Sequence, residues 1–337
     1  MNNSKRIKIG HIGTLHDHSS GKLECIKKFP SIFELVGVVA ENKEQIEQCK
    51  QNAAYDGVRW LSEEELFAVP DLDAVLIETE ELSLVKTAQK CIDRGLHVHM
   101  DKPAGESYKD FEHLLQSAAQ KNLTVQLAYM YRYNPAIKKA LEFVKNGKLG
   151  NIYQVEAVMN TGHDEKKREW LARFSGGIMF FLGCHMVDLA LMFRGKPKKI
   201  VPYNFSSGFD GVMSLDNCRA VFIYDNGISL VESVACEING FGRRRLAICG
   251  SRGSIVIEPL ETVFSSDVPT KMKITTDDYA ETFLDKSKVL YCDSMTGRYD
   301  EMMKEFAAIV NGEISNPFTF EYELLVQKCL LEACEII

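Results

Sequence analysis

The sequence predicts an α/β fold: a Rossmann-type doubly wound parallel sheet, then an α+β domain with a large, mainly antiparallel open sheet. Over roughly the first 130 residues, short apolar runs alternate with helical segments, as in sheets built from right-handed crossovers. Later runs alternate polar and apolar residues and are joined by turns such as Asp225-Asn226-Gly227, which is typical of antiparallel hairpins. The predicted domains are 1–130 and 131–337.

The first half contains five predicted strands. Leu35–Ala40 is apolar on both faces, which indicates a strand buried in a parallel sheet covered by helices. After the strand at 74–77, apolar residues recur at helical spacing up to Gly95, the expected end of a helix. The five strands are expected at 7–13, 35–40, 74–77, 96–100 and 123–128.

The second half begins after Tyr133-Asn134-Pro135, which marks the crossover between the domains. Its predicted strands are 152–158, 217–224, 228–236, 244–249 and 254–257, and its predicted helices are 183–193, 298–311 and 321–335. The C-terminal helix is a candidate for packing back on the first domain.

Composition excludes several classes of function. The 337 residues carry a formal net charge of −7, which argues against a binder of nucleic-acid backbones. No stretch is long and apolar enough for a membrane span, and no signal-peptide pattern opens the chain. We therefore expect a cytoplasmic protein without nucleic-acid or membrane partners. The ten cysteines form no Cys-x-x-Cys pair and are expected to be reduced, mostly buried residues.

Lys102 is the first candidate functional residue. It follows the apolar run 96–100 and precedes Pro103, so it is expected at the carboxyl end of a strand, where open α/β sheets bind ligands. A cation there suits a hydroxyl, a carbonyl or a developing alkoxide. The alternative is an exposed loop lysine before a proline.

The loop after the first strand is a degenerate phosphate loop. A dinucleotide loop would have glycines at 13, 15 and 18, but only Gly13 is present, and Leu15 and His18 replace the others. The helix N-terminus that follows still favours an anion; the alternative is a helix start that binds no phosphate. Glu41, after the second strand, suits the two ribose hydroxyls of an adenosine and repels a 2′-phosphate, unless it is simply a solvated glutamate.

A third pattern spans Ser175–Asp188. A glycine pair precedes a helix that presents His185 and Asp188 at i and i+3, on one face. His185 is suited to proton transfer near neutral pH, with Asp188 orienting its ring. The alternative is a satisfied core histidine.

Together these motifs resemble the Gfo/Idh/MocA family of NAD(P)-dependent oxidoreductases. Asp101-Lys102-Pro103 is similar to the family's Glu-Lys-Pro motif, and Tyr131–Pro135 to its Arg-Phe-Asn-Pro crossover. The tract 175–188 is similar to its Gly-Gly-Gly…Asp-x-Gly-x-His-x-x-Asp signature, and Gly250–Ser254 to a turn before a late strand.

The resemblance implies a dinucleotide-binding first domain and a second domain that binds substrate and forms homodimers or homotetramers through its sheet. It implies hydride transfer at a secondary hydroxyl of a sugar, inositol or related polyol, with NAD favoured over NADP by Glu41. The implied catalytic residues are Lys102 and His185. The implied cofactor-binding residues are Gly13, Thr14, Leu15, Glu41, Thr79, Asp101 and Lys102. Those expected on the substrate side are Tyr131, Arg132 and Asp188, with Lys167 and Arg168 as weaker candidates and Trp170 as a packing residue.

Departures from the family pattern favour a second hypothesis. The expected cofactor side carries three acidic residues, Glu78, Glu80 and Glu81, which should weaken dinucleotide binding unless they turn outward. Phe181 stands where the family often has a catalytic aspartate. A non-catalytic relative that senses a nucleotide or sugar in the same cleft is therefore the alternative function.

A metal site is a third and weaker idea. His16 and His18 flank Asp17, and His99 or His185 could lie nearby; such a set suits zinc or manganese. No spacing elsewhere supports it, so the favoured interpretation has no metal.

Overall fold

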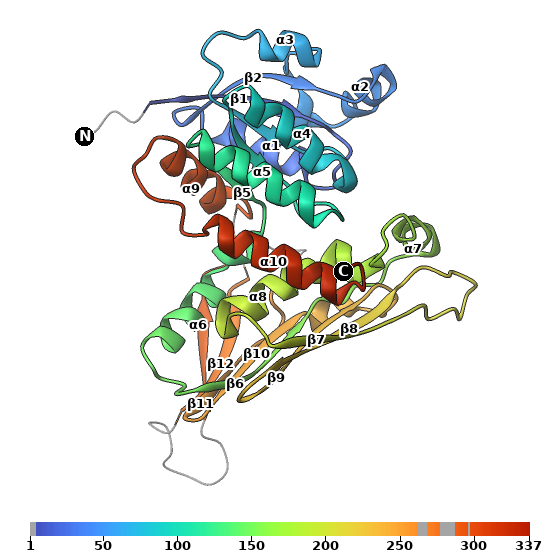
Figure 1. Ribbon diagram of the computed structural model, residues 1–337, viewed down its shortest axis with the longest axis vertical. Coiled ribbons are helices and arrows are strands. Elements are labelled where there is room, and N and C mark those ends of the chain that lie inside the picture. The colour runs from blue at the N-terminus through green and yellow to red at the C-terminus, as the bar shows by residue number, and fades with distance from the viewer. Residues whose placement is uncertain (1–4, 262–267, 277–286, 296) are drawn as a thin grey trace. The chain divides into compact units, whose positions relative to one another are not determined.

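The computed structural model describes residues 5–261, 268–276, 287–295 and 297–337. The chain forms two compact units (Figure 1). The first comprises Met1–Met130 and Gly297–Leu324, and the second comprises Tyr131–Thr296 and Leu325–Ile337. The first unit thus takes in a segment from near the end of the sequence.

The first unit is built on a five-stranded parallel sheet of order β2-β1-β3-β4-β5. All four residues of β3 are fully buried, because helices cover both faces of the sheet (Figure 1). The chain crosses from one side of β1 to the other between β2 and β3, which creates the switch point where such sheets bind ligands. The strands are β1 (Ile7–Ile12), β2 (Phe33–Val39), β3 (Ala74–Ile77), β4 (His97–Met100) and β5 (Val125–Leu127).

Helix boundaries in this unit follow local sequence signals. The α4 helix buries Leu84, Ala88 and Cys91 on one face, and Gly95, just past its end, has a φ of +81°, as expected for a glycine that terminates a helix. The helices are α1 (Ser19–Lys28), α2 (Lys43–Cys49), α3 (Glu63–Phe67), α4 (Leu84–Asp93), α5 (Tyr108–Gln120) and α9 (Asp300–Val310).

The second unit is built on an eight-stranded sheet of order β13-β12-β11-β10-β6-β9-β8-β7. Among these neighbouring strands only β6 and β9 pair in parallel, so the second sheet is mainly antiparallel. Together with the parallel first sheet, this confirms the predicted fold class. Asp225 and Asn226 form the turn between β8 and β9, where Tyr224 pairs with Gly227. The strands are β6 (Ile152–Val158), β7 (Lys199–Phe205), β8 (Asn217–Tyr224), β9 (Gly227–Val234), β10 (Arg245–Gly250), β11 (Gly253–Ile257), β12 (Thr270–Thr276) and β13 (Ser287–Cys292).

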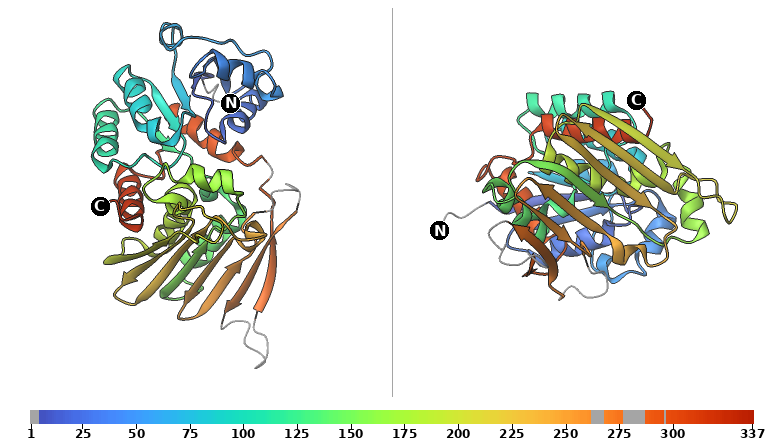
Figure 2. Two further views of the ribbon diagram at one scale, coloured as in Figure 1. Left: turned by 90° about the vertical axis from the view of Figure 1, so that its right-hand side faces the viewer. Right: turned by 90° about the horizontal axis from the view of Figure 1, so that it is seen from below.

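The helices of the second unit gather on one face of this sheet (Figure 2). They are α6 (Pro135–Lys145), α7 (Glu165–Leu171), α8 (Cys184–Arg194) and the end of α10 (Phe320–Ala333). β12 alternates buried residues such as Met272 and Ile274 with exposed Lys271 and Lys273, the pattern of a sheet with one open face. Among the described residues, no helix combines the length and hydropathy that a membrane crossing requires.

Candidate active site

The β1–α1 loop begins at a glycine that the fold requires. Gly13 has a φ of +93°, and a Cβ there would lie 2.3 Å from the backbone nitrogen of Thr79. β1 and the segment after β3 therefore approach more closely than any other residue allows. Leu15, in the next part of the loop, is 49% exposed, and α1 begins at Ser19. The predicted cofactor residues Gly13 and Thr79 thus lie side by side.

Thr14 and Glu41 are bonded to each other. The backbone N–H of Thr14 donates to Glu41 Oε1 at 3.0 Å, and the Thr14 hydroxyl donates to Oε2 at 2.8 Å. A cavity of about 190 Å³ adjoins them, lined by Thr14, His16, Ser19, Ser20, Gln45, Gln48, Cys49, Asn52 and Tyr55. The carboxylate expected at the end of β2 is therefore held against the loop by two hydrogen bonds.

A buried ion cluster lies at the carboxyl ends of β3 and β4. The Lys22 ammonium donates to Glu78 Oε1 at 2.7 Å and to Asp101 Oδ2 at 2.5 Å, and all three side chains are fully buried. Burial by itself disfavours the ammonium, but Asp101 and Glu78 outweigh burial and raise the pKa of Lys22. Burial raises the pKa of Glu78 well above its usual range, against the opposing effect of Lys22. Buried charges of this kind are stable only when paired.

Sequence reasoning missed Lys22. The signal was its position: Lys22 lies on the buried face of α1, between Gly21 and Leu23. An ionisable residue on an apolar helix face needs a buried partner, so this position could have predicted an ion pair. The side chains of Glu78 and Glu81, which the sequence places on the cofactor side, point into the protein: the two residues are 0% and 3% exposed.

Lys102 lies where the sequence placed it, directly after β4. It is 1% exposed, and its backbone N–H donates to Asp101 Oδ1 at 2.7 Å. Asp101 therefore bonds Lys22 through one oxygen and the backbone of Lys102 through the other. This arrangement orients the chain at the point where Lys102 leaves the sheet.

In the second unit, His185 is the second residue of α8 and is 2% exposed. The Tyr131 ring stands edge-on to it, with centroids 5.2 Å apart. Asp188 binds Arg132, which donates through Nε at 3.0 Å and Nη2 at 2.8 Å. The structure thus brings Tyr131 to His185, and Arg132 to Asp188.

Phe181 belongs to an aromatic cluster just before α8. Its ring stacks on Phe174 with centroids 5.9 Å apart and meets Trp170 edge-on at 5.1 Å. Lys167 Nζ lies 3.8 Å from the centroid of Trp170, a cation–π contact. Phe181 therefore belongs to an apolar wall, at the position where the resemblance led us to expect a carboxylate.

Arg168 plays a different part from its neighbour Lys167. It is 3% exposed, bonds Asp216 at 3.0 Å and pairs with Asp210. These ion pairs tie α7 to the 206–216 segment.

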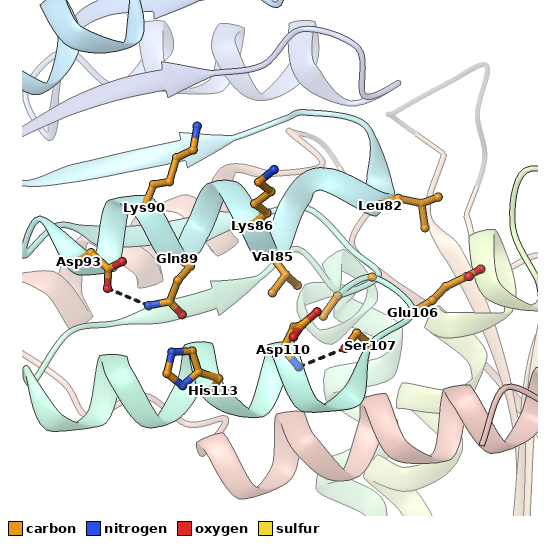
Figure 3. A pocket seen from close by; sticks show the side chains of 12 residues that line it. Leu82, Val85, Lys86, Gln89, Lys90, Asp93, Glu106, Ser107, Asp110 and His113 are labelled. Atoms are coloured by element: carbon orange, nitrogen blue, oxygen red, sulfur yellow. Dashed lines mark hydrogen bonds between the residues drawn. The ribbon is translucent and has the colours of Figure 1, made fainter.

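A second cavity, of about 500 Å³, lies between α4 and α5 (Figure 3). Some of the polar groups that line it already bond to each other within one helix or at its start. Gln89 donates to Asp93 at 2.9 Å, and Ser107 accepts from the backbone N–H of Asp110 at 3.2 Å. These contacts serve the two helices, so the cavity is a weaker candidate for chemistry than the sheet edge near Lys102.

Such a fold and strand-end site define a class, the two-domain dinucleotide-dependent oxidoreductases. Residues 7–129 match the model of an oxidoreductase family with an NAD-binding Rossmann fold, and residues 137–256 match the GFO/IDH/MocA C-terminal domain. The chain belongs to the Gfo/Idh/MocA family, whose members are NAD(P)-dependent dehydrogenases acting on CH–OH groups.

Individual relatives are distant. The chain is 21% identical over 319 residues to the myo-inositol 2-dehydrogenase of Thermotoga maritima, covering 91% of this chain and 90% of that protein. It is 28% identical over 170 residues to a D-xylose 1-dehydrogenase (NADP(+)) of Haloferax volcanii, covering 49% and 51%. A putative NADPH-dependent oxidoreductase of Desulfitobacterium hafniense has the same fold, with a TM-score of 0.83 at 15% identity, covering 98% and 95%.

Proposed function

We propose that this protein transfers a hydride between NAD and a secondary hydroxyl of a sugar, inositol or related polyol. Membership of the family supports the reaction type, and the inositol and xylose relatives support the substrate class. The observation that carries the proposal is the buried Lys102 at the carboxyl end of β4, next to Asp101.

The proposed chemistry divides between two side chains. The bound nicotinamide would accept or supply the hydride. Lys102 holds the reacting hydroxyl and stabilises negative charge developing on its oxygen. His185 takes or returns the hydroxyl proton, since imidazole is suited to proton transfer near neutral pH. Tyr131, packed edge-on, restricts the rotation of the His185 ring.

Preference for NAD over NADP rests on Glu41. Its carboxylate lies at the end of β2 against Thr14, where it suits ribose hydroxyls and opposes a 2′-phosphate. Gly13, Thr14, Leu15, Thr79 and Asp101 form the remaining cofactor side of the proposed site.

Titration calorimetry with NAD and with NADP tests the proposal first, followed by absorbance assays of hydride transfer on inositols, pentoses and hexoses. Tighter binding of NAD and turnover on at least one polyol are expected. Absence of binding to both dinucleotides would rule out the dehydrogenase function.

Non-catalytic sensing of a nucleotide or sugar is the second candidate. The packing of Phe181 with Trp170 and Phe174 favours it, because that wall offers no proton-exchanging group. Dinucleotide binding combined with a lack of turnover across the polyol panel is the result that selects this function.

We also propose that the open sheet face forms a homodimer or homotetramer. Tyr203, Phe205 and Tyr291 on its strands are 51%, 61% and 67% exposed, and large exposed apolar surface is typical of interaction sites. Sedimentation velocity of the wild type and of Phe205→Asp tests this assembly; a wild-type monomer at micromolar concentration contradicts it.

A further inference from the structure

His16, His18 and Asp101 converge in the first unit from two distant segments. The two histidines come from the β1–α1 loop, and the aspartate follows β4. One nitrogen or oxygen atom from each lies within 4.8 Å of the others. His16 and Asp101 are buried, whereas the His18 side chain is 17% exposed.

The hydrogen bonds show which way the atoms face. The backbone N–H of His18 donates to Nδ1 of His16 at 3.3 Å, so this nitrogen is unprotonated. It would exchange that long hydrogen bond for a bond to an ion. Asp101 Oδ2 lies 3.4 Å from the same nitrogen, and Glu78 Oε2 lies 3.6 Å from it. Among the described residues, Glu78 Oε2 has no hydrogen-bond partner. Lys22 already supplies one positive charge to Asp101 and Glu78. A further buried acceptor without a hydrogen bond, such as Glu78 Oε2, is costly unless a cation or a donor reaches it.

Two separations around His16 match a small metal ion. Bonds of 2.0–2.2 Å to nitrogen and oxygen place tetrahedral ligands about 3.3–3.6 Å apart. The two contacts of His16 Nδ1, at 3.4 and 3.6 Å, fall within this range. His18 Nδ1 and Asp101 Oδ2 are closer, at 3.0 Å, and would move slightly apart to share an ion. We propose that His16, His18, Asp101 and Glu78 bind a divalent transition metal, with zinc the ion that fits this nitrogen and oxygen set best.

Glu81 and the local charge balance support the same site. Glu81 Oε1 lies 3.8 Å from His16 Nε2, on the far side of the ring from Nδ1. This separation is too long for a hydrogen bond, and His16 Nε2 has none among the described residues. With an ion on Nδ1 the proton would be on Nε2, and Glu81 is the carboxylate near enough to approach it and orient the ring. The buried carboxyl groups of Glu78, Glu81 and Asp101 outnumber the buried ammonium groups of Lys22 and Lys102.

The Lys22 ammonium would compete with a metal ion for the same carboxylates. It already contacts Asp101 Oδ2 and Glu78 Oε1, but it leaves Glu78 Oε2 for the ion.

Zinc content of the whole chain tests the site directly. After chelation, the protein is dialysed against zinc and its metal is measured by elemental analysis; about one bound zinc per chain is expected. His16→Ala and His18→Ala should each weaken binding at least about 10-fold. His113→Ala, an exposed histidine on α5, is the matched control and should bind like the wild type.

Cobalt(II) supplies a second readout and separates this site from the ten cysteines, which form no disulfides and remain thiols. Visible bands of a tetrahedral ion without a thiolate charge-transfer band are expected. Glu78→Gln, which keeps the side-chain shape, should weaken the bands even if the histidine variants fold poorly. Less than stoichiometric zinc, a thiolate band, or unchanged binding in Glu78→Gln and both histidine variants overturns the proposal. None of these readouts depends on dehydrogenase activity.

Discussion

Glu41 is hydrogen-bonded to Thr14 in the β1–α1 loop. The backbone N–H and the hydroxyl of Thr14 both donate to the Glu41 carboxylate, at 3.0 and 2.8 Å. The residue proposed to select the cofactor thus also holds the loop that would meet the phosphates. Under the proposed function, this one side chain would set both the position of the loop and the preference for NAD.

Glu41→Ala should weaken NAD binding about 10- to 100-fold, because hydrogen bonds to charged groups contribute about 1.5–3 kcal/mol. NADP binding should not weaken in parallel, since the repulsion of the 2′-phosphate is also removed. Calorimetry with both dinucleotides measures this. Glu34→Ala is the matched control, because Glu34 lies on β2, the strand that precedes Glu41, and its partner is Arg6 at the surface. Equal loss of affinity for NAD and NADP would contradict a selective role.

Lys102→Ala should lower turnover by about 100- to 10,000-fold, the usual contribution of a positioned proton-transfer or charge-stabilising group. Dinucleotide affinity should change much less. Steady-state kinetics and calorimetry on one preparation measure the two effects. Lys109→Ala, an exposed lysine at the start of α5, should behave as the wild type. Full turnover by Lys102→Ala would remove Lys102 from the mechanism.

Lys22→Met should destabilise the first unit by about 3–5 kcal/mol, because it leaves buried carboxylates without their cation. Lys22→Met combined with Glu78→Gln should recover part of the loss, since one of the two carboxylates is then neutral. Hydrogen exchange of peptides covering β3 and β4 reports on this unit alone. A double variant less stable than Lys22→Met would show that the pairing of Lys22 with Glu78 is not the source of the effect.

His11 should make the first unit acid-sensitive. Burial is the main cause that lowers its pKa from 6.5 to about 3, so the unfolded state binds a proton that the folded state rejects. Its contribution to stability is complete above pH 6.5 and is lost as the pH falls toward 3. Between pH 7 and pH 5 the loss is about 2 kcal/mol.

Urea unfolding at the two pH values, followed by Trp60 fluorescence in a Trp170→Phe background, isolates the first unit. The difference in unfolding free energy should shrink by about 2 kcal/mol in His11→Gln. An unchanged difference would mean that His11 does not carry this acid sensitivity.

The sequence by itself determined the fold class, the five strands of the first sheet and five of the eight strands of the second; β7, β12 and β13 were not predicted. Continuous apolar runs and polar–apolar alternation are local patterns, and they report directly on burial from two faces or from one. For the same reason Lys102 could be placed at a strand end, and His185 and Asp188 on one helix turn. Family membership followed from motifs whose order along the chain is specific.

Tertiary structure alone decided which side chains meet. Lys22 joins Glu78 and Asp101 across 56 and 79 residues of chain, and Asp188 turns to Arg132. His16 and His18 meet Asp101, whereas His99 bonds Gln126 at 2.7 Å. Pairings of this kind depend on crossover geometry and on the need to neutralise charge in a medium of low polarity. A local pattern carries neither kind of information, so the strands could be predicted from the sequence but their buried charge network could not.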